Sequence, residues 1–380
     1  MSAPTLVDVQ APETARSSAD ARPRRVVAIV PAYNEAAAIA ATIQSLRDQT
    51  RPPDLIVVVP NNCTDDTAAV AEAAGAYVLK YPGHNEDKKA GAINFALDRL
   101  EPYLIEQPWH TAVLVMDADT TLGSGFIETA VDELAAGVGG VGGTFVARPS
   151  TTALGFLQAL EFHRYGQVAK RMGYRAFVLT GTGTLFSWQA LRDVREQRRR
   201  GVLLPKGASY YDTHSLTEDN ELTLALQTCG YLVRAPEGMW ATTDVMDTVG
   251  KLAGQRKRWY LGALRNLAQY GRRMPGHMRW TYWRQQSGLF LSAVVAAVYL
   301  IALVASLAVF GGVDFRWYWA APTVLLLIER VATVWRMGWR ARLYAAAFVP
   351  EQLYTLLLTF IYTRAFFAFV RGERGGWAAT

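Results

Sequence analysis

Two patterns of hydrophobic and polar positions alternate along the chain from residue 25 to residue 148. Short β-branched or aliphatic runs are separated by alanine-rich stretches with the mixed polarity of helices. The runs predict strands over 25–30, 54–59, 77–80 and 111–117, and the stretches predict helices over 35–48, 65–74 and 88–99. This order predicts an α/β fold with a mostly parallel sheet that helices cover on both faces.

The last third of the chain has a different pattern. Residues 271–286 interleave arginines with Trp280, Tyr282 and Trp283, which predicts an amphipathic segment at a membrane surface. Residues 287–313 contain no charged side chain and exceed the roughly 20 residues that one bilayer crossing needs. They predict a transmembrane helix, and two further candidates follow at 317–335 and 343–370.

The topology of the third candidate stays open. The basic run 336–342 indicates a cytosolic connection before it. A full crossing by 343–370 would move the arginine-containing tail at 372–380 to the other side of the membrane, so this segment either crosses or lies partly in the interface. Pro350, Glu351 and Arg364 interrupt it.

The remaining segments complete the predicted organisation. Residues 1–24 are rich in Ala, Pro, Ser and Thr without periodicity, which predicts a flexible tail with neither signal peptide nor membrane span. Residues 25–270 are then expected to form a cytosolic domain, and residues 287–371 to form the membrane helices of a multi-pass protein of the inner cell membrane. Five arginines in 192–200 indicate a solvated helix or loop face.

Composition narrows the function classes. With 51% hydrophobic and 19% charged residues, the chain is neither disordered nor collagenous. Two cysteines exclude a disulfide scaffold and a multi-cysteine zinc site. The formal net charge is +6, but basic residues concentrate beside the membrane segments and no zinc-finger or RNA-recognition motif occurs, so we expect no nucleic-acid partner.

Polar clusters follow three of the predicted strands, at 31–35, 61–66 and 117–119. Ligands of parallel sheets bind beyond the carboxyl ends of the strands. Asp117 and Asp119 suit a hard divalent cation and a phosphate ligand, although they could equally be a polar strand end or a helix cap. Lys89 starts a predicted helix, where anions are favoured.

Two further clusters leave alternatives open. In residues 217–219, one carboxylate could be a general base, or Thr217 and Glu218 could simply cap the next helix. Residues 255–259 could bind a diphosphate and stack a sugar on Trp259, or begin the membrane-surface belt.

Taken in order, these motifs resemble family 2 of the glycosyltransferases. The resemblance is to the membrane-bound branch with cellulose, chitin, hyaluronan and poly-N-acetylglucosamine synthases. The matching segments are Pro31-Ala32-Tyr33-Asn34-Glu35, Asn61 to Asp65, Lys89-Ala90-Gly91-Ala92, Asp117-Ala118-Asp119, Gly181-Thr182-Gly183-Thr184, Thr217-Glu218-Asp219 and Gln255-x-x-Arg258-Trp259. The family often has two acidic residues where this chain has Pro60-Asn61, and an asparagine supplies no charge to a uracil site.

The resemblance implies a GT-A nucleotide-sugar-binding fold and a role for each motif. A UDP-sugar would be bound by Tyr33, Glu35, Asn61, Lys89, Asp117 and Asp119. Asp119, with Asp117, would hold Mg²⁺ or Mn²⁺ on the diphosphate. Asp219 would be the general base, and Glu218 and Arg258 would also be catalytic. The acceptor would contact Gly181, Thr182, Gly183, Thr217, Gln255 and Trp259.

The implied activity is inverting transfer of a sugar to a growing β-linked polysaccharide of the poly-N-acetylglucosamine or cellulose type. Two alternatives remain. One is a single transfer to a lipid acceptor, and the other is a catalytically silent sugar-nucleotide-binding scaffold. The expected partners are the UDP-sugar, a polysaccharide or lipid acceptor and the bilayer, with a homo-oligomer or a separate export protein as further options.

Overall fold

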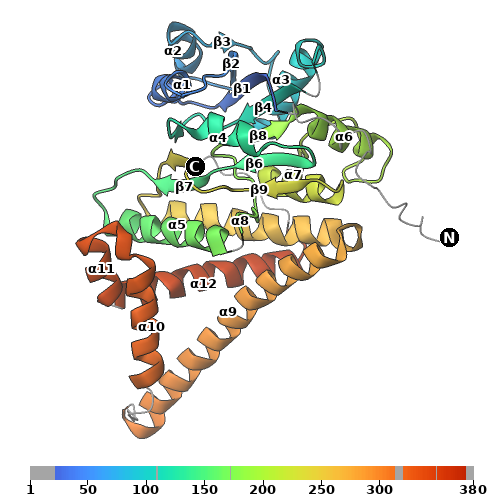
Figure 1. The fold of residues 1–380 in the computed structure, drawn as a ribbon. Coiled ribbons are helices and arrows are strands. Elements are labelled where there is room, and N and C mark those ends of the chain that lie inside the picture. Colours follow the sequence, from blue (N-terminus) through green and yellow to red (C-terminus); the bar gives the residue numbers. More distant parts are fainter. Residues whose placement is uncertain (1–21, 108–109, 172, 313–319, 348, 374–380) are drawn as a thin grey trace, which may run out of the picture. The chain divides into compact units, whose positions relative to one another are not determined.

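The structure is a computed structural model that describes residues 22–107, 110–171, 173–312, 320–347 and 349–373 (Figure 1). Most of the predicted 1–24 tail and of the 372–380 tail lies outside the described residues. The chain divides into two compact units. Unit 1 consists of Met1–Arg148, Val168–Asp244 and Gln269–Pro275, and unit 2 consists of Pro149–Gln167, Val245–Ala268 and Gly276–Thr380.

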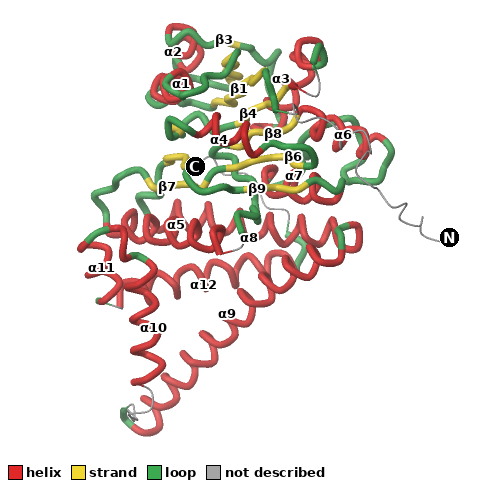
Figure 2. Tube along the Cα trace, in the orientation of Figure 1, coloured by secondary structure: helices red, strands yellow, loops and turns green. Residues whose placement is uncertain are grey.

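Unit 1 contains the strands (Figure 2). They are β1 (Arg25–Ala32), β2 (Leu55–Pro60), β3 (Tyr77–Val78), β4 (Thr111–Val115), β5 (Thr121–Leu122), β6 (Val138–Gly142), β7 (Thr144–Ala147), β8 (Thr184–Ser187), β9 (Leu232–Arg234) and β10 (Trp240–Thr243). The four strands predicted from the hydrophobic runs are therefore present as β1 to β4.

The main sheet has the order β3-β2-β1-β4-β8-β6-β9. Strands β1 to β4 pair in parallel, as predicted, and β6 pairs in parallel with β9. Strand β8 runs antiparallel to both β4 and β6, which makes the sheet mixed. A smaller sheet has the order β5-β10-β7. Because β1, β2 and β4 are parallel, their carboxyl ends lie at the same edge of the main sheet.

Helices cover both faces of the main sheet. Over both units, the helices of the described residues, including the 3₁₀ helices η3 and η5, are α1 (Ile39–Arg47), α2 (Thr67–Ala73), α3 (Lys88–Leu104), α4 (Phe126–Glu133), α5 (Ala153–Arg171), α6 (Trp188–Arg199), α7 (Glu218–Thr228), α8 (Val249–Tyr270), η3 (Gly271–Arg273), α9 (Gly276–Phe310), α10 (Ala320–Thr333), η5 (Trp335–Met337), α11 (Trp339–Ala346) and α12 (Val349–Val370). Helix α3 contacts β1 and β2, and α6 contacts β4, β6 and β8.

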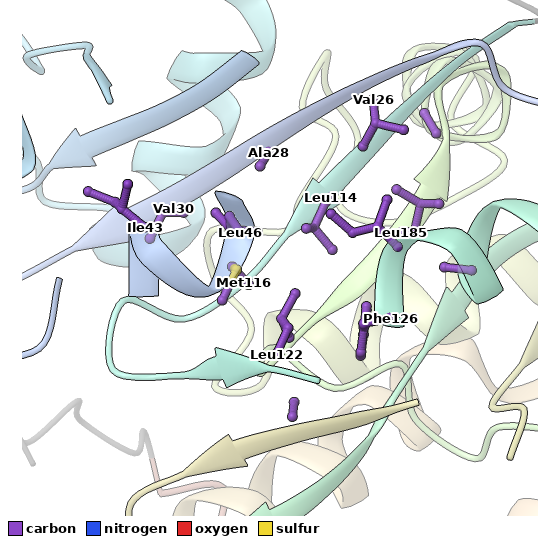
Figure 3. Close-up of a cluster of buried hydrophobic side chains, with 14 of the residues drawn as sticks. Val26, Ala28, Val30, Ile43, Leu46, Leu114, Met116, Leu122, Phe126 and Leu185 are labelled. Atoms are coloured by element: carbon purple, nitrogen blue, oxygen red, sulfur yellow. The ribbon is translucent and has the colours of Figure 1, made fainter. Parts of the chain in front are cut away.

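The core of unit 1 forms between the sheet and helices α1, α2 and α4 (Figure 3). Alternate residues of β1, such as Val26 and Val30, pack there against Ile43 of α1 and Phe126 of α4, and all four side chains are buried. The intervening residues of β1 are buried as well, which is why the strand has no polar residue after Arg25. Burial on both faces fixes the register of β1 at the centre of the sheet.

Unit 2 contains α9 to α12, and the pattern there differs from the predicted segments. Helix α9 begins at Gly276, so much of the predicted interfacial segment 271–286 is continuous with the first predicted span. The second span corresponds to α10, with 313–319 outside the described residues. The third, 343–370, is divided, because α11 ends at Ala346 and α12 begins at Val349.

Helix α12 is long and apolar enough to cross a membrane by length and composition, and it is the sole helix to meet that test among the described residues. One such helix does not support the predicted multi-pass topology, which stays a prediction.

Candidate active site

The loops that follow β1 and β2 are bound to each other. The side-chain oxygen of Asn34 accepts a hydrogen bond from the backbone N–H of Thr64 at 2.8 Å, and the Thr67 hydroxyl accepts one from the N–H of Glu35 at 2.8 Å. Asn34 and Asn62 have positive φ angles of 55° and 56°, a conformation that asparagine tolerates better than most residues. These contacts delay the start of α1 to Ile39, four residues after the predicted start.

Of the residues predicted to bind the nucleotide here, Tyr33 is exposed and Asn61 is buried. The side-chain oxygen of Asn61 accepts a hydrogen bond from the Asn85 amide at 2.7 Å. Asn85 also donates to the backbone oxygen of Lys88, the first residue of α3. Asn85 therefore ties the β2 loop to the start of α3. Sequence reasoning missed it, since a single asparagine in a loop carries no signal.

Glu35 lies in an acidic environment. Its pKa is raised to about 7, first by burial and then by the negative charges of Asp119, Asp117, Asp244 and Asp65. The carboxyl group is therefore partly protonated at neutral pH. Because the charges of Asp119 and Asp117 affect Glu35, the predicted motifs after β1 and β4 lie close to each other.

Lys89 joins two of the predicted motifs. Its ammonium group lies 2.5 Å from a carboxylate oxygen of Asp117 and 3.1 Å from one of Glu218. Burial alone would lower the pKa of Lys89, but the charges of Asp117, Glu218 and Asp219 outweigh it and raise the pKa. Lys89 therefore stays charged and holds the end of β4 next to the start of α7.

Asp119 is mostly buried beside Asp117. Burial, followed by the charge of Asp117, raises the pKa of Asp119 to about 6. Arg148 donates to the Asp119 backbone oxygen at 2.9 Å and forms an ion pair with Asp244 at 2.5 Å. Sequence reasoning missed Arg148 and Asp244, because the strands that bring them here are far apart in sequence.

A bound metal would have to use these carboxylates together with ligand oxygens. Among the described residues, no group of three His, Cys, Asp or Glu side chains is placed to hold a metal ion by itself. Asp117 and Asp119 offer hard oxygen ligands, and the neighbouring excess of negative charge favours a cation. Mg²⁺ typically takes one or two protein carboxylates and completes its shell with water and phosphate oxygens.

Asp219 is held by two backbone groups at the start of α7. One carboxylate oxygen accepts a hydrogen bond from the N–H of Gly181 at 3.0 Å, and the other accepts one from the N–H of Asn220 at 2.7 Å. Burial, followed by the charge of Glu218, raises the pKa of Asp219 to about 6, against the opposing effects of Lys89 and the two N–H groups. This carboxylate is ionised at neutral pH and more basic than an ordinary aspartate.

A pocket is lined by the predicted catalytic residues Glu218 and Asp219 together with Lys89, Gly181 and Tyr211. Gly181 is the one predicted acceptor residue in this lining, which does not include Thr182, Gly183 or Thr217. Gly181 leaves room for the Lys89 ammonium group, since a Cβ atom there would lie 2.6 Å from its nitrogen.

Thr180 and Thr182, on either side of Gly181, contact each other within the same loop. The hydroxyl groups of Thr180 and Thr182 lie 2.8 Å apart, and a Cβ atom at Gly183 would lie 2.9 Å from Leu122 and 3.3 Å from Phe126. Thr217 precedes α7, but its side chain makes no capping hydrogen bond to that helix.

Gln255, Arg258 and Trp259 lie on α8 in unit 2, unlike the other predicted site residues. There the Gln255 oxygen accepts a hydrogen bond from Arg256 at 2.7 Å, and the Arg256 guanidinium lies 4.2 Å from the centre of the Trp259 ring. The motif alone did not single out Arg256.

Comparison with known proteins gives a consistent result. Residues 27–195 match the family described as Glycosyl transferase family 2, and residues 112–371 match Glycosyl transferase family group 2. Two poly-beta-1,6-N-acetyl-D-glucosamine synthases, one of Staphylococcus epidermidis and one of its strain RP62A, are 25% and 24% identical over 237 residues. Each match covers 60% of this chain and 52% of the relative, so the chain spans about half the length of the curated relatives it matches.

A solved structure of similar fold is a mannosyltransferase from Pyrobaculum calidifontis in complex with GDP-Man and Mn²⁺. It is 19% identical, with a TM-score of 0.59 over 93% of this chain and 88% of that one. With the strand order of unit 1, this similarity shows that the chain has the GT-A fold.

Proposed function

We propose a specific reaction on the premise that the chain belongs to Glycosyl transferase family group 2 and is a glycosyltransferase. The reaction is inverting transfer of N-acetylglucosamine from UDP-N-acetylglucosamine to a hydroxyl group at the end of a growing β-linked polysaccharide. The names of the two relatives support the choice of sugar and of a polymeric product.

Asp219 carries the proposal. An acceptor hydroxyl becomes a good nucleophile when a base takes its proton as the new bond forms, and a base is most effective when its pKa lies near the working pH. Asp219 meets this requirement with a pKa of about 6. The hydrogen bonds from Gly181 and Asn220 fix the direction of its carboxylate, which leaves no need for reorientation during the reaction.

Bond formation and bond breaking then occur in a single displacement step. The acceptor oxygen forms a bond to the anomeric carbon, while the bond from that carbon to the diphosphate oxygen breaks. The acceptor proton moves to the Asp219 carboxylate, and the bonding electron pair leaves with UDP. Attack opposite the leaving group inverts the α-linked donor to a β-linked product.

Asp117 and Asp119 would hold Mg²⁺ or Mn²⁺, which when bound neutralises negative charge on the diphosphate. The paired carboxylates and the raised pKa of Asp119 support this assignment. Lys89, fixed between Asp117 and Glu218, would keep these carboxylates in position and add positive charge beside the donor. Tyr33, Glu35 and Asn61 would contact the uridine.

The family motif assigns Arg258 to the diphosphate, and it assigns Gln255 and Trp259, like Gly181 to Gly183 and Thr217, to the acceptor. This part of the proposal depends on the family motif. Half-buried Gln255 and Trp259 are accessible enough to contact a ligand.

The proposed location is the inner membrane with the catalytic unit in the cytosol. Helix α12 supports it, and so do the exposed apolar side chains along α9, such as Leu291, Val298 and Ile301, which are 62%, 59% and 69% exposed. A continuous exposed apolar surface of this kind indicates contact with lipid or with another protein.

The test uses the purified full-length chain in detergent with Mn²⁺ and a panel of UDP-sugars plus GDP-mannose. We expect UDP release and a ladder of products with UDP-N-acetylglucosamine, and neither with Asp219→Asn. A single product would favour transfer of one sugar to a lipid. UDP binding without turnover in the parent protein would favour the silent scaffold.

A further inference from the structure

Arg256 occupies the position between two residues of the α8 motif, and its side chain is almost completely buried, with 1% exposed. One of its guanidinium nitrogens donates to the Gln255 side-chain oxygen at 2.7 Å, and another donates to Glu161 at 2.9 Å. The flat guanidinium group lies 4.2 Å from the centre of the Trp259 ring. We propose that Arg256 is a positioning residue that fixes Gln255 and Trp259 relative to each other for acceptor binding.

The chemistry of arginine suits this task. A guanidinium group can donate hydrogen bonds in its plane while its face stacks on an aromatic ring. Trp259 is three positions after Arg256 and therefore on the same side of the helix. One rigid group thus determines both the direction of the Gln255 amide and the tilt of the Trp259 ring.

Arg256 is itself anchored from two other helices. Glu161 of α5 pairs with it, and the Tyr354 hydroxyl group of α12 donates to the same Glu161 oxygen at 2.5 Å (helices in Figure 1). All of these contacts lie within unit 2. The anchor therefore connects the motif to the helix that is long and apolar enough to cross a membrane.

Stability alone gives no reason to bury the Arg256 guanidinium group, whose partner Glu161 keeps 31% of its side chain exposed. Removing charges from water is costly, and a well-packed apolar side chain of similar volume is often as stabilising as a buried ion pair. A requirement for orientation does explain a charged, planar group between Gln255 and Trp259. The inference rests on the proposed function, which assigns these two residues to the acceptor.

The position of Gln255 and Trp259 should affect whether the donor sugar is transferred to the acceptor or hydrolysed by water. Water can replace the acceptor hydroxyl and hydrolyse UDP-N-acetylglucosamine, and this side reaction needs no acceptor contact. A change that disorders Gln255 and Trp259 should therefore reduce transfer more than hydrolysis. A change that only weakens the fold would reduce both together.

The test compares the full-length Arg256→Lys variant with the parent in detergent. Lysine keeps a charge for Glu161, so folding is preserved, but it cannot donate to Gln255 and stack on Trp259 at once. The matched control is Arg199→Lys, the same change at an exposed residue of α6. Product and free sugar are measured together, with UDP-N-acetylglucosamine as donor and a β-1,6-linked tetramer of N-acetylglucosamine as acceptor.

We expect the ratio of transfer to hydrolysis to fall about tenfold in Arg256→Lys, with a raised KM for the tetramer, and to stay at the parent value in the control. A second measurement follows the ring directly by fluorine NMR of 5-fluorotryptophan-labelled protein, in which Trp259→Phe identifies the Trp259 signal. That signal should shift or broaden in Arg256→Lys and remain in place in the control.

Two results would overturn the inference. One is an Arg256→Lys protein with the parent ratio and an unmoved Trp259 signal. The other is a parallel loss of transfer and hydrolysis with a lowered melting temperature, which would indicate a purely structural role. A moved Trp259 signal in a chain whose parent form transfers no sugar would leave the positioning intact and reject the proposed function instead.

Discussion

Glu218 and Asp219 are consecutive residues at the start of α7, but their carboxylates have different kinds of partner. Glu218 pairs with the Lys89 ammonium group at 3.1 Å, whereas Asp219 accepts hydrogen bonds from the backbone N–H groups of Gly181 and Asn220. The Lys89 ion pair occupies the Glu218 carboxylate, whereas the backbone groups orient that of Asp219. This difference supports the proposal that Asp219, and not Glu218, is the base.

Replacing Asp219 by asparagine should abolish most of the turnover. The amide keeps the shape of the side chain but cannot accept a proton, and loss of a general base typically costs about 10²- to 10⁴-fold in rate. Steady-state UDP release measures the effect, and UDP binding should persist. The control is Asp132→Asn, at an exposed surface ion pair. An Asp219→Asn enzyme within threefold of the parent, or about half a log unit, would contradict the assignment.

Activity should fall in acid with a midpoint near pH 6. A base works only when deprotonated, and the pKa of Asp219 is raised to about 6, mainly by burial and then by Glu218. Turnover should therefore be constant above this pH and lost below it. It should be measured as kcat at saturating donor, because Asp119 and Glu35, with pKa values of about 6 and 7, also titrate here and affect donor binding.

The Glu218→Gln variant provides the check on the cause of this midpoint. It removes a negative charge that raises the pKa of Asp219, so the acid limb should move to lower pH. A limb that stays in place, or moves upward, would show that another group controls the profile.

Gly181→Ala should impair activity more than stability. The new Cβ would lie 2.6 Å from the Lys89 nitrogen, and the flexible end of that lysine would move away at little cost to folding. Its ion pairs with Asp117 and Glu218 would then lengthen but remain, which displaces the ammonium group while the carboxylates keep their counterion. We expect about a tenfold loss of turnover with the melting temperature nearly unchanged. Gly125→Ala is the control, because nothing lies within 4 Å of its added Cβ. Equal activities of the two variants would argue against a role for Lys89.

The hydrophobic pattern predicted the part of the fold that local sequence determines. Strands β1, β2 and β4 are apolar after the first residues Arg25 and Thr111, because both faces of each are covered, and the polar clusters at their ends lie where the pattern placed them. The pattern did not predict that β8, near residue 185, inserts antiparallel beside β4. Pairing between distant segments depends on tertiary packing, which no local periodicity contains.

The candidate site was likewise predicted only in part, because contacts between distant residues are not visible in the sequence. Asp117, Asp119, Lys89 and Asp219 were identified because they recur in an ordered set of motifs. Arg148, Asp244, Asn85 and Arg256 were not, since each acts through a contact with a residue that is either remote in sequence or outside the motif pattern. The run of arginines at 192–200 also gave a wrong prediction of exposure for one residue, because burial depends on which side of a helix faces the core.

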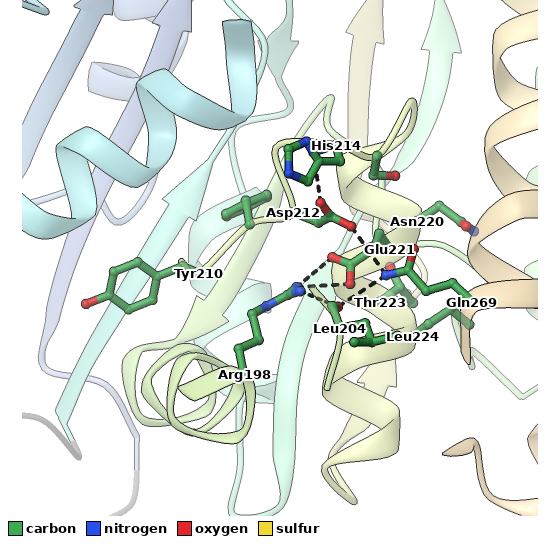
Figure 4. Close-up of polar contacts among 12 residues, drawn as sticks. Arg198, Leu204, Tyr210, Asp212, His214, Asn220, Glu221, Thr223, Leu224 and Gln269 are labelled. Atoms are coloured by element: carbon green, nitrogen blue, oxygen red, sulfur yellow. Dashed lines mark hydrogen bonds and ion pairs between the residues drawn. The ribbon is translucent and has the colours of Figure 1, made fainter. Parts of the chain in front are cut away.

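That residue is Arg198. The run 192–200 was interpreted as a solvated face, which is correct for Arg199 and Arg200 but wrong for Arg198, whose side chain is completely buried in α6. Its guanidinium group donates to both oxygens of Glu221 at 3.0 and 2.7 Å (Figure 4). The Tyr270 hydroxyl group also donates to Glu221.

Arg198→Met should therefore destabilise unit 1 strongly. Removing one partner leaves the buried Glu221 charge without its counterion, which typically costs about 3–5 kcal/mol. Arg200→Met is the matched control, because its exposed pair with Glu196 on the same helix contributes at most about 0.5 kcal/mol. Unfolding by denaturant, followed by fluorescence in detergent, compares the two variants.

The double variant Arg198→Met/Glu221→Met separates the ion pair from simple packing. If the cost comes from an uncompensated charge, replacing Glu221 as well removes that charge, and most of the lost stability should return. If the cost comes from lost packing volume, the second change should add to the first. Because Glu221 follows Asp219 by two residues on α7, activity of the double variant would further show whether this buried pair also holds the base in place.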